Sequence, residues 1–128
     1  MEIQAPDAGT GAGQSRIPPE LEAFFGMAER WRLSTDEQVV LLGSPGRSTF
    51  FKWKKEGGSL PADTRERLSH LLTIWKSLRI LFTIDERGEE WIRARNRYFD
   101  GTSALDVMLE GLSGIYRVRR YLDAQRGA

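Results

Sequence analysis

Cationic and polar side chains in residues 47–55 have the types and spacing of a nucleic-acid contact surface. If this segment is helical, residues three or four positions apart share a face. The side chains that would share the outer face are Arg47, Ser48, Phe51, Lys52 and Lys55. Arginine and lysine bind phosphates and base edges, serine can donate a hydrogen bond to either, and a phenylalanine ring can contact a thymine methyl group. The segment therefore predicts a DNA-contact helix, with an ordinary solvated helical face as the alternative.

A second group of cations lies close to the C-terminus. Residues 116–121 combine two tyrosines with Arg117, Arg119 and Arg120. Such a surface suits nucleic acid or an acidic partner, but cations in the last turns of a helix also interact favourably with its macrodipole. From the residues alone, binding to nucleic acid, binding to a partner and simple solvation all stay open.

Residues that could support catalysis are scarce. The chain has no cysteine and a single histidine, His70, so it offers no thiolate nucleophile and no cysteine- or histidine-based metal site. The acidic pairs Asp85-Glu86 and Glu89-Glu90 fit the start of a helix, where carboxylates interact favourably with the macrodipole. No glycine-rich phosphate loop follows a strand. We therefore expect a binding protein without a cofactor rather than an enzyme.

The composition predicts one ordinary domain or two small helical modules. Of the 128 residues, 40% are hydrophobic and 29% are charged, which allows a packed core. The formal net charge is only +1, so nucleic-acid binding would need a local cationic patch. The sequence shows neither a signal-peptide-like apolar run nor a membrane-spanning stretch. We expect a cytoplasmic protein that does not bind membranes.

The predicted DNA-contact helix follows two other helical segments. Residues 18–33 form the first, which two prolines open. Ser34 and Glu37 have the pattern of a capping box at the start of the second. Ser44 is predicted to cap the third helix, with Pro45 at its first position. A short helix, a tight turn and a second, basic helix are typical of a helix-turn-helix.

The longest helical pattern covers residues 60–84, where Asp63 and Glu66 resemble another cap. Its wide apolar stripe should be mostly core, but a share of it could form a homodimer interface. The predicted interface residues are Leu71, Ile74, Trp75 and Leu78. Because helix-turn-helix proteins usually bind two half-sites as dimers, a dimer also agrees with DNA binding.

Shorter segments complete the predicted fold. Asp85 should cap a helix that ends near residue 95, and Ser103 should cap the next one. Gly114 should break the pattern before a last helix over residues 115–124. No segment alternates apolar and polar residues in the way a half-buried strand does. The predicted fold class is therefore all-α.

These patterns divide the chain into four regions. Residues 1–16 almost lack large apolar side chains and should form a disordered arm, because they cannot offset their ordering entropy by burial. Residues 17–58 hold the helix-turn-helix, and residues 59–84 form a connecting and dimerisation helix. Residues 85–128 form a small C-terminal helical domain.

Several motifs along the chain occur in a specific order and spacing. They are Leu41-Leu42-Gly43, Arg47-Ser48-Thr49, Lys52-Trp53-Lys54, Ile74-Trp75-Lys76, Phe99-Asp100-Gly101, Ser103-Ala104-Leu105-Asp106 and Val118-Arg119-Arg120-Tyr121-Leu122. The first three resemble the Xre-like helix-turn-helix of the Xre/MbcA/ParS-type antitoxins. The next resembles the long connecting helix of that family, and the last three resemble its C-terminal toxin-binding domain.

The resemblance implies the antitoxin of a type II toxin–antitoxin pair, whose usual partner is a RES-domain toxin that depletes cellular NAD. It implies that the C-terminal region covers the active site of the toxin. It also implies that the helix-turn-helix binds operator DNA and represses the operon, usually as a homodimer. Carried over to this chain, the toxin contacts are Arg119, Arg120, Tyr121, Asp123 and Arg126. The alternatives are a stand-alone DNA-binding transcriptional regulator without a toxin, and a helical interaction module that has lost DNA binding.

Overall fold

The computed structural model describes residues 17–127, and the predicted disordered arm of residues 1–16 lies outside the described residues. The described chain is built of helices: α1 (Pro19–Arg30), α2 (Thr35–Leu41), α3 (Arg47–Glu56), α4 (Ala62–Leu81), α5 (Asp85–Trp91), the 3-10 turn η2 (Arg97–Phe99), α6 (Ala104–Leu109) and α7 (Leu112–Gln125). The all-α prediction is confirmed. No helix within residues 17–127 has both the length and the apolar character needed to cross a bilayer.

The predicted caps are confirmed at two helix starts. The Ser34 hydroxyl accepts a hydrogen bond from the Glu37 N–H at 3.0 Å, and the Glu37 carboxylate accepts one from the Ser34 N–H at 2.8 Å. This is the reciprocal capping box that the sequence predicts for α2. At α6, the Ser103 hydroxyl accepts from the Asp106 N–H at 3.0 Å. Each cap satisfies backbone donors that the first turn of a helix leaves without a partner.

The prediction that Ser44 caps α3 is wrong. The Ser44 N–H donates to the Val39 carbonyl at 2.9 Å, and the Gly43 N–H donates to the Val40 carbonyl at 3.1 Å. These two bonds form a Schellman motif, with Gly43 at φ +100° and Ser44 at φ +59°. Ser44 therefore completes the end of α2, and Gly46 stands at the N-cap of α3.

Three other local predictions are also wrong. Asp63 does not cap α4, because its carboxylate pairs with Arg67 at 2.9 Å and Pro61 is the N-cap. Asp85 is the first residue of α5 rather than its cap, and α5 ends at Trp91. Gly114 does not break a helix but lies inside α7, where a Cβ atom would collide with the Val107 carbonyl of α6. This glycine permits close packing of the two helices.

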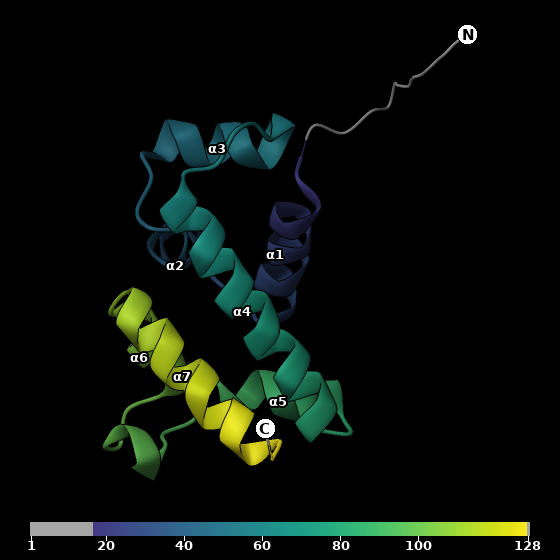
Figure 1. The fold of residues 1–128 in the computed structure, drawn as a ribbon, viewed down its shortest axis with the longest axis vertical. Helices are drawn as coiled ribbons and strands as arrows, with labels where there is room; N and C mark the ends of the chain where they lie inside the picture. The colour runs from purple at the N-terminus through teal and green to yellow at the C-terminus, as the bar shows by residue number, and fades with distance from the viewer. Residues whose placement is uncertain (1–16, 128) are drawn as a thin grey trace, which may run out of the picture.

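The long helix α4 is the centre of the fold (Figure 1). It packs against α1 on one side and against α7 on the other, while α5 folds back beside its C-terminal half. The buried residues of its inner faces are Thr64, Leu68, Leu71, Ile74, Ser77 and Leu78. Leu71, Ile74 and Leu78 are at most 2% exposed within the single chain, so they do not form a dimer surface. Of the predicted interface residues, only Trp75 is partly exposed.

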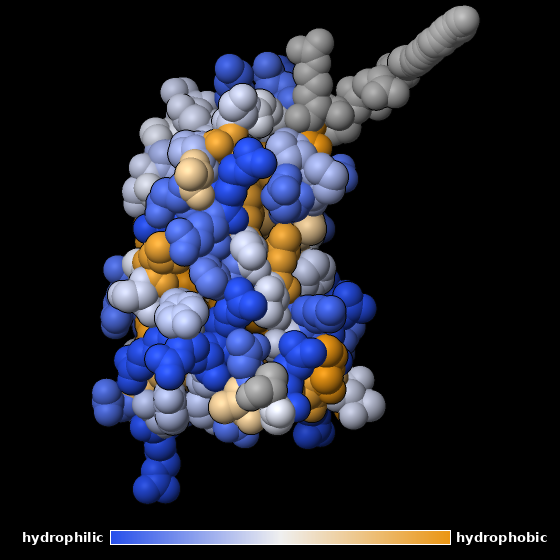
Figure 2. Space-filling view, viewed as in Figure 1, coloured by the Kyte–Doolittle hydropathy of each residue, from blue (hydrophilic) through white to orange (hydrophobic). Residues whose placement is uncertain are grey.

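The two predicted contact regions lie at opposite ends of the long axis. Figure 1 shows α3 at one end, and α5 with the C-terminal end of α7 at the other. Figure 2 shows a mostly hydrophilic face in this view, with a hydrophobic group over the C-terminal end of α4. Ile80 and Ile84, in that part of the chain, are 55% and 51% exposed. The fold therefore leaves three distinct surfaces available to partners.

Candidate functional site

The outer face of α3 carries all five side chains of the predicted DNA-contact set. Phe50 and Trp53 are buried on the opposite face, as their spacing predicts. The predicted residues Arg47, Ser48, Phe51, Lys52 and Lys55 are all exposed, as are Thr49, Lys54 and Glu56 of the same helix. One face of α3 is therefore anchored in the core, and the opposite face presents cations to solvent. This arrangement suits a helix that enters the major groove of DNA.

Contacts within the helix-turn-helix orient Arg47. Its guanidinium donates to the Asp36 carboxylate at 2.8 Å and lies 5.7 Å from the centre of the Phe51 ring. Lys52 and Lys55 form no ion pair within residues 17–127, so both ammonium groups are available to phosphates. The helix-turn-helix thus presents one guanidinium paired with Asp36 and two ammonium groups without an ion pair in the described residues.

The structure separates the predicted toxin contacts into two groups. Arg119 faces α4, where it donates to the His70 Nδ1 atom at 2.8 Å. Arg126 also faces α4 and donates to the Ser77 hydroxyl at 3.1 Å. Asp123 lies 3.6 Å from Arg119 on the same side of α7. Arg119 and Arg126 thus join the C-terminal part of the chain to α4, and Asp123 pairs with Arg119 beside this contact.

Tyr121 belongs to an aromatic cluster. Its ring stacks on Trp91 with ring centres 5.9 Å apart, and it contacts Tyr98 at 4.4 Å and Phe99 at 5.6 Å. Phe99 is buried, whereas Tyr98 is 55% exposed, so only one of the two η2 aromatics anchors the turn by burial. Tyr121 therefore supports the position of η2 and presents little of its own surface.

A hollow of about 600 Å³ opens on the other side of α7. Among its lining residues are Tyr98, Ser113, Tyr116, Arg117, Arg120 and Gln125. Arg120 is the only predicted toxin contact besides Tyr121 that lines it. Tyr116 and Arg117 belong to the cationic segment 116–121 that the sequence singles out, but not to the toxin contacts that the resemblance implies, and Tyr98 belongs to neither set. Tyr116, Arg117 and Arg120 already share one face of the predicted helix over residues 115–124, whereas Tyr98 comes from a different element, η2.

Two family models together cover most of the chain. Residues 18–72 match the antitoxin Xre-like helix-turn-helix domain, and residues 77–127 match the antitoxin Xre/MbcA/ParS C-terminal toxin-binding domain. The chain belongs to the Xre/MbcA/ParS antitoxin family. Both matched domains are regulatory or binding domains and not enzymes, in agreement with the sequence prediction.

A relative of this antitoxin occurs in Sinorhizobium fredii (strain NBRC 101917 / NGR234), as the uncharacterized protein y4oB. The two chains are 72% identical over 114 residues, which is 88% of this chain and 88% of the relative. The similarity therefore extends through both domains. The first domain ends and the second begins within α4, so this helix is shared between them.

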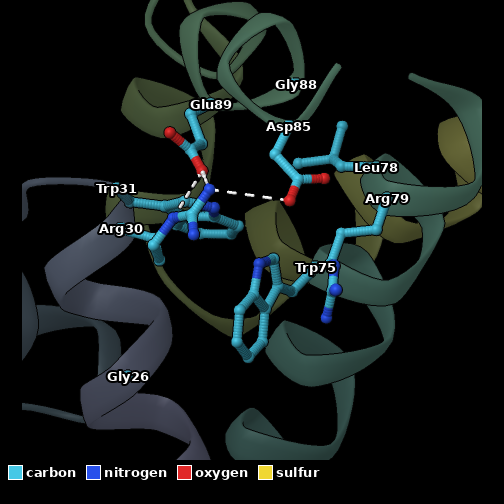
Figure 3. Close-up of a pocket in the computed structure, with 9 residues that line it drawn as sticks. All are labelled: Gly26, Arg30, Trp31, Trp75, Leu78, Arg79, Asp85, Gly88 and Glu89. Carbon is cyan, nitrogen blue, oxygen red and sulfur yellow. Dashed lines mark hydrogen bonds and ion pairs between the residues drawn. The ribbon is translucent and has the colours of Figure 1, made fainter. Parts of the chain in front are cut away.

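Two arginines join the helix-turn-helix domain of the antitoxin to its toxin-binding domain. Arg93 donates to the Trp31 carbonyl at 3.0 Å and to the Arg32 carbonyl at 2.9 Å, at the C-terminal end of α1. Arg30 lies 2.7 Å from the Glu89 carboxylate and 3.6 Å from that of Asp85 (Figure 3). The hydrogen bond and the negative charge of Glu89 raise the pKa of Arg30 above its ordinary value.

A pocket of about 330 Å³ lies beside the Arg30 ion pairs. Trp75 and Arg79 of α4 line it across from Arg30 of α1, and Gly26 of α1 also lines it (Figure 3). The Arg79 guanidinium lies 5.6 Å from the centre of the Trp75 ring. At the junction of the two domains, the acidic side chains of Asp85 and Glu89 and the basic side chains of Arg30 and Arg79 thus surround the Trp75 ring.

Proposed function

We propose that this antitoxin neutralises a RES-type toxin that depletes NAD, and that it represses its own operon from the cytoplasm. The observation that carries the proposal is the combination, in one chain, of an Xre-like helix-turn-helix domain and a toxin-binding domain. In the family that the sequence resembles, this combination accompanies a RES-domain partner. The C-terminal region of residues 85–128 would cover the active site of the toxin.

Operator binding is assigned to α3 in this proposal. Support comes from its three exposed cations, Arg47, Lys52 and Lys55. They concentrate positive charge on one helix face, although the net charge of the whole chain is only +1. Phosphate contacts by such cations supply affinity and register, while Ser48, Phe51 and Arg47 have the chemistry to contact base edges. The C-terminal end of α7 lies at the opposite end of the molecule from α3, which supports separate surfaces for DNA and toxin (Figure 1).

The proposed homodimer uses a different part of α4 from the one that the sequence suggested. Trp75 and Leu72 are partly exposed, and Ile80 is 55% exposed. Arg30 and Arg79 alternate with Asp85 and Glu89 around the adjoining pocket. A surface that carries both charge signs can complement its own copy across a two-fold axis, as a symmetric dimer requires. We therefore assign dimerisation to the surface of Leu72, Trp75 and Ile80.

Co-expression with the reading frame adjacent to the antitoxin gene tests the neutralisation proposal. The adjacent protein alone should stop growth and lower cellular NAD. Addition of the antitoxin should restore both and yield a stable complex that co-purifies. Arrest without a fall in NAD would contradict the RES assignment. If the adjacent protein neither stops growth nor forms a complex with the antitoxin, the neutralisation proposal is wrong and a stand-alone DNA-binding regulator is favoured.

A further inference from the structure

The hollow beside α7 is a cationic surface without acidic residues. Its eight lining residues are Tyr98 and seven residues of α7 that include Arg117, Arg120 and Tyr121, and none is Asp or Glu. Within residues 17–127, Arg120 forms no ion pair, and its guanidinium lies 5.8 Å from the centre of the Tyr116 ring. Arg117 donates one hydrogen bond to the Tyr98 carbonyl at 3.4 Å and lies 4.0 Å from the Asp100 carboxylate, which is 93% exposed. Its guanidinium also lies 5.3 Å from the centre of the Phe99 ring. Both guanidinium groups therefore keep donors for a partner.

Two large aromatic side chains border the same hollow and are exposed. Tyr98 is 55% exposed and Tyr116 is 48% exposed. Their rings are nevertheless held in place. Tyr98 contacts Tyr121 at 4.4 Å and Phe99 at 5.1 Å, and Tyr116 contacts His70 at 5.5 Å. An exposed aromatic ring that is already ordered loses little conformational entropy when a partner covers it.

Arg119 of α7 and Arg126, which directly follows α7, are used within the chain. Arg119 and Arg126 donate to His70 and Ser77 of α4. One side of the helix is therefore joined to α4, whereas Arg117 and Arg120 line the hollow on the other side, where Arg117 also contacts η2. Tyrosine and arginine are also the residue types that most often dominate the binding energy of protein interfaces.

We infer that the hollow of Tyr98, Tyr116, Arg117 and Arg120 is the anchor site for an acidic segment of the toxin. This inference rests on the proposed function, in which a toxin binds the C-terminal domain. Carboxylates of the segment accept paired hydrogen bonds from Arg117 and Arg120, since guanidinium and carboxylate match in plane and spacing. An apolar or aromatic side chain of the segment packs on the Tyr98 and Tyr116 rings.

The chemistry of the hollow favours a protein segment over a nucleic acid. The cations are two in number and lie around a concave aromatic surface, whereas non-specific nucleic-acid binding needs a cationic track along the backbone. The basic face of α3, at the other end of the molecule, is the better nucleic-acid surface (Figure 1). The two surfaces are far enough apart to be tested independently by substitution.

The test is the affinity of the full-length antitoxin for the purified product of the adjacent reading frame, measured by titration calorimetry. Arg120→Glu and Arg117→Glu should each weaken the complex by at least about 30-fold, and Tyr116→Ala by about 10-fold or more. Arg65→Glu, an exposed position in the part of α4 that belongs to the helix-turn-helix domain, is the matched charge-reversal control outside the hollow and should change the affinity by less than about 3-fold. Circular dichroism and thermal unfolding verify that each variant is folded.

The possible results separate this inference from the proposed function. If the wild-type antitoxin binds the toxin and the folded Arg117, Arg120 and Tyr116 variants bind it with the same affinity, the inference is wrong but the proposed function stands. Failure of the wild-type antitoxin to bind the adjacent product overturns both. If Arg117→Glu and Arg120→Glu instead weaken retention of operator DNA, the hollow is a nucleic-acid surface and the inference is wrong.

Discussion

Arg47, Lys52 and Lys55 share the exposed face of α3 but are held in different ways. Arg47 pairs with Asp36 at the surface and lies over the Phe51 ring, whereas the two lysines form no ion pair within the described residues. A planar guanidinium in a fixed orientation suits recognition of a base edge or a single phosphate. Flexible ammonium groups suit phosphates whose positions vary with sequence. We therefore expect Lys52 and Lys55 to contribute mainly to the electrostatic part of DNA binding.

Replacement of either lysine should reduce the salt dependence of operator binding. Each lost phosphate contact removes about 0.9 from the slope of log affinity against log salt concentration, so Lys52→Gln with Lys55→Gln should remove about 1.8. The measurement is fluorescence anisotropy of a fragment from upstream of the antitoxin gene, over a range of salt concentrations. Arg87→Gln on α5 also removes one positive charge, far from α3, and should leave the slope unchanged. An unaltered slope in the double variant would show that α3 does not face phosphates.

Glycines inside two helices differ in what surrounds them. A Cβ atom on Gly26, in the middle of α1, would meet no atom within 4 Å. A Cβ atom on Gly114, in α7, would collide with the Val107 carbonyl. Both residues have helical backbone angles, so the intrinsic preference for alanine is the same at both positions. Only the neighbouring helix distinguishes them.

The same substitution should therefore have opposite effects at these two positions. Gly26→Ala should raise the free energy of unfolding by about 0.5–1 kcal/mol, because alanine loses less backbone entropy on folding. Gly114→Ala should lower it by about 2 kcal/mol or more, because α6 and α7 must move apart. Urea denaturation followed by circular dichroism gives both values. A stabilised Gly114→Ala variant would contradict the close packing of α6 on α7.

At the scale of the whole molecule, α4 belongs to both family domains, and Arg30 and Arg93 form further contacts between the two domains. Arg93 donates to two carbonyl groups at the end of α1, which have no helical partner of their own. Arg93→Ala should lower the free energy of unfolding by about 1.5–3 kcal/mol, the usual loss for a hydrogen bond to a charged group. Arg95→Ala, two residues further along the exposed surface, serves as the matched control. Equal losses in the two variants would rule out a joining role for Arg93.

The proposed dimer also belongs to the scale of the whole molecule. Ile80→Glu or Trp75→Glu should place a charge on the proposed interface and shift the antitoxin toward the monomer, by at least a 10-fold rise in the dimer dissociation constant. Analytical ultracentrifugation across a range of concentrations measures this shift. Ile80 is the safer position for folding, because it is 55% exposed in the single chain. A wild-type antitoxin that stays monomeric at high concentration would disprove the dimer.

The sequence by itself determined the local structure of this antitoxin. The all-α class, the Ser34 and Ser103 caps, and the division of α3 into a buried face of Phe50 and Trp53 and an exposed cationic face all follow from interactions within a few residues. The family also followed from the order of local motifs. Predicted helix boundaries were wrong where backbone hydrogen bonds of a loop decide where a helix ends. Ser44 is an example, because its N–H donates to the Val39 carbonyl and so completes the end of α2.

Only the tertiary structure decided which helical faces remain free. Leu71, Ile74 and Leu78 have the pattern of an interface, but the helices packed around α4 cover them, so Trp75, Leu72 and Ile80 are left to a partner. Arg119 and Arg126 are as cationic as Arg117 and Arg120, yet their side of α7 lies on α4. Tyr98 reaches the same hollow from a different element. Helical periodicity assigns residues to faces, whereas the packing of distant segments decides which of those faces meets solvent.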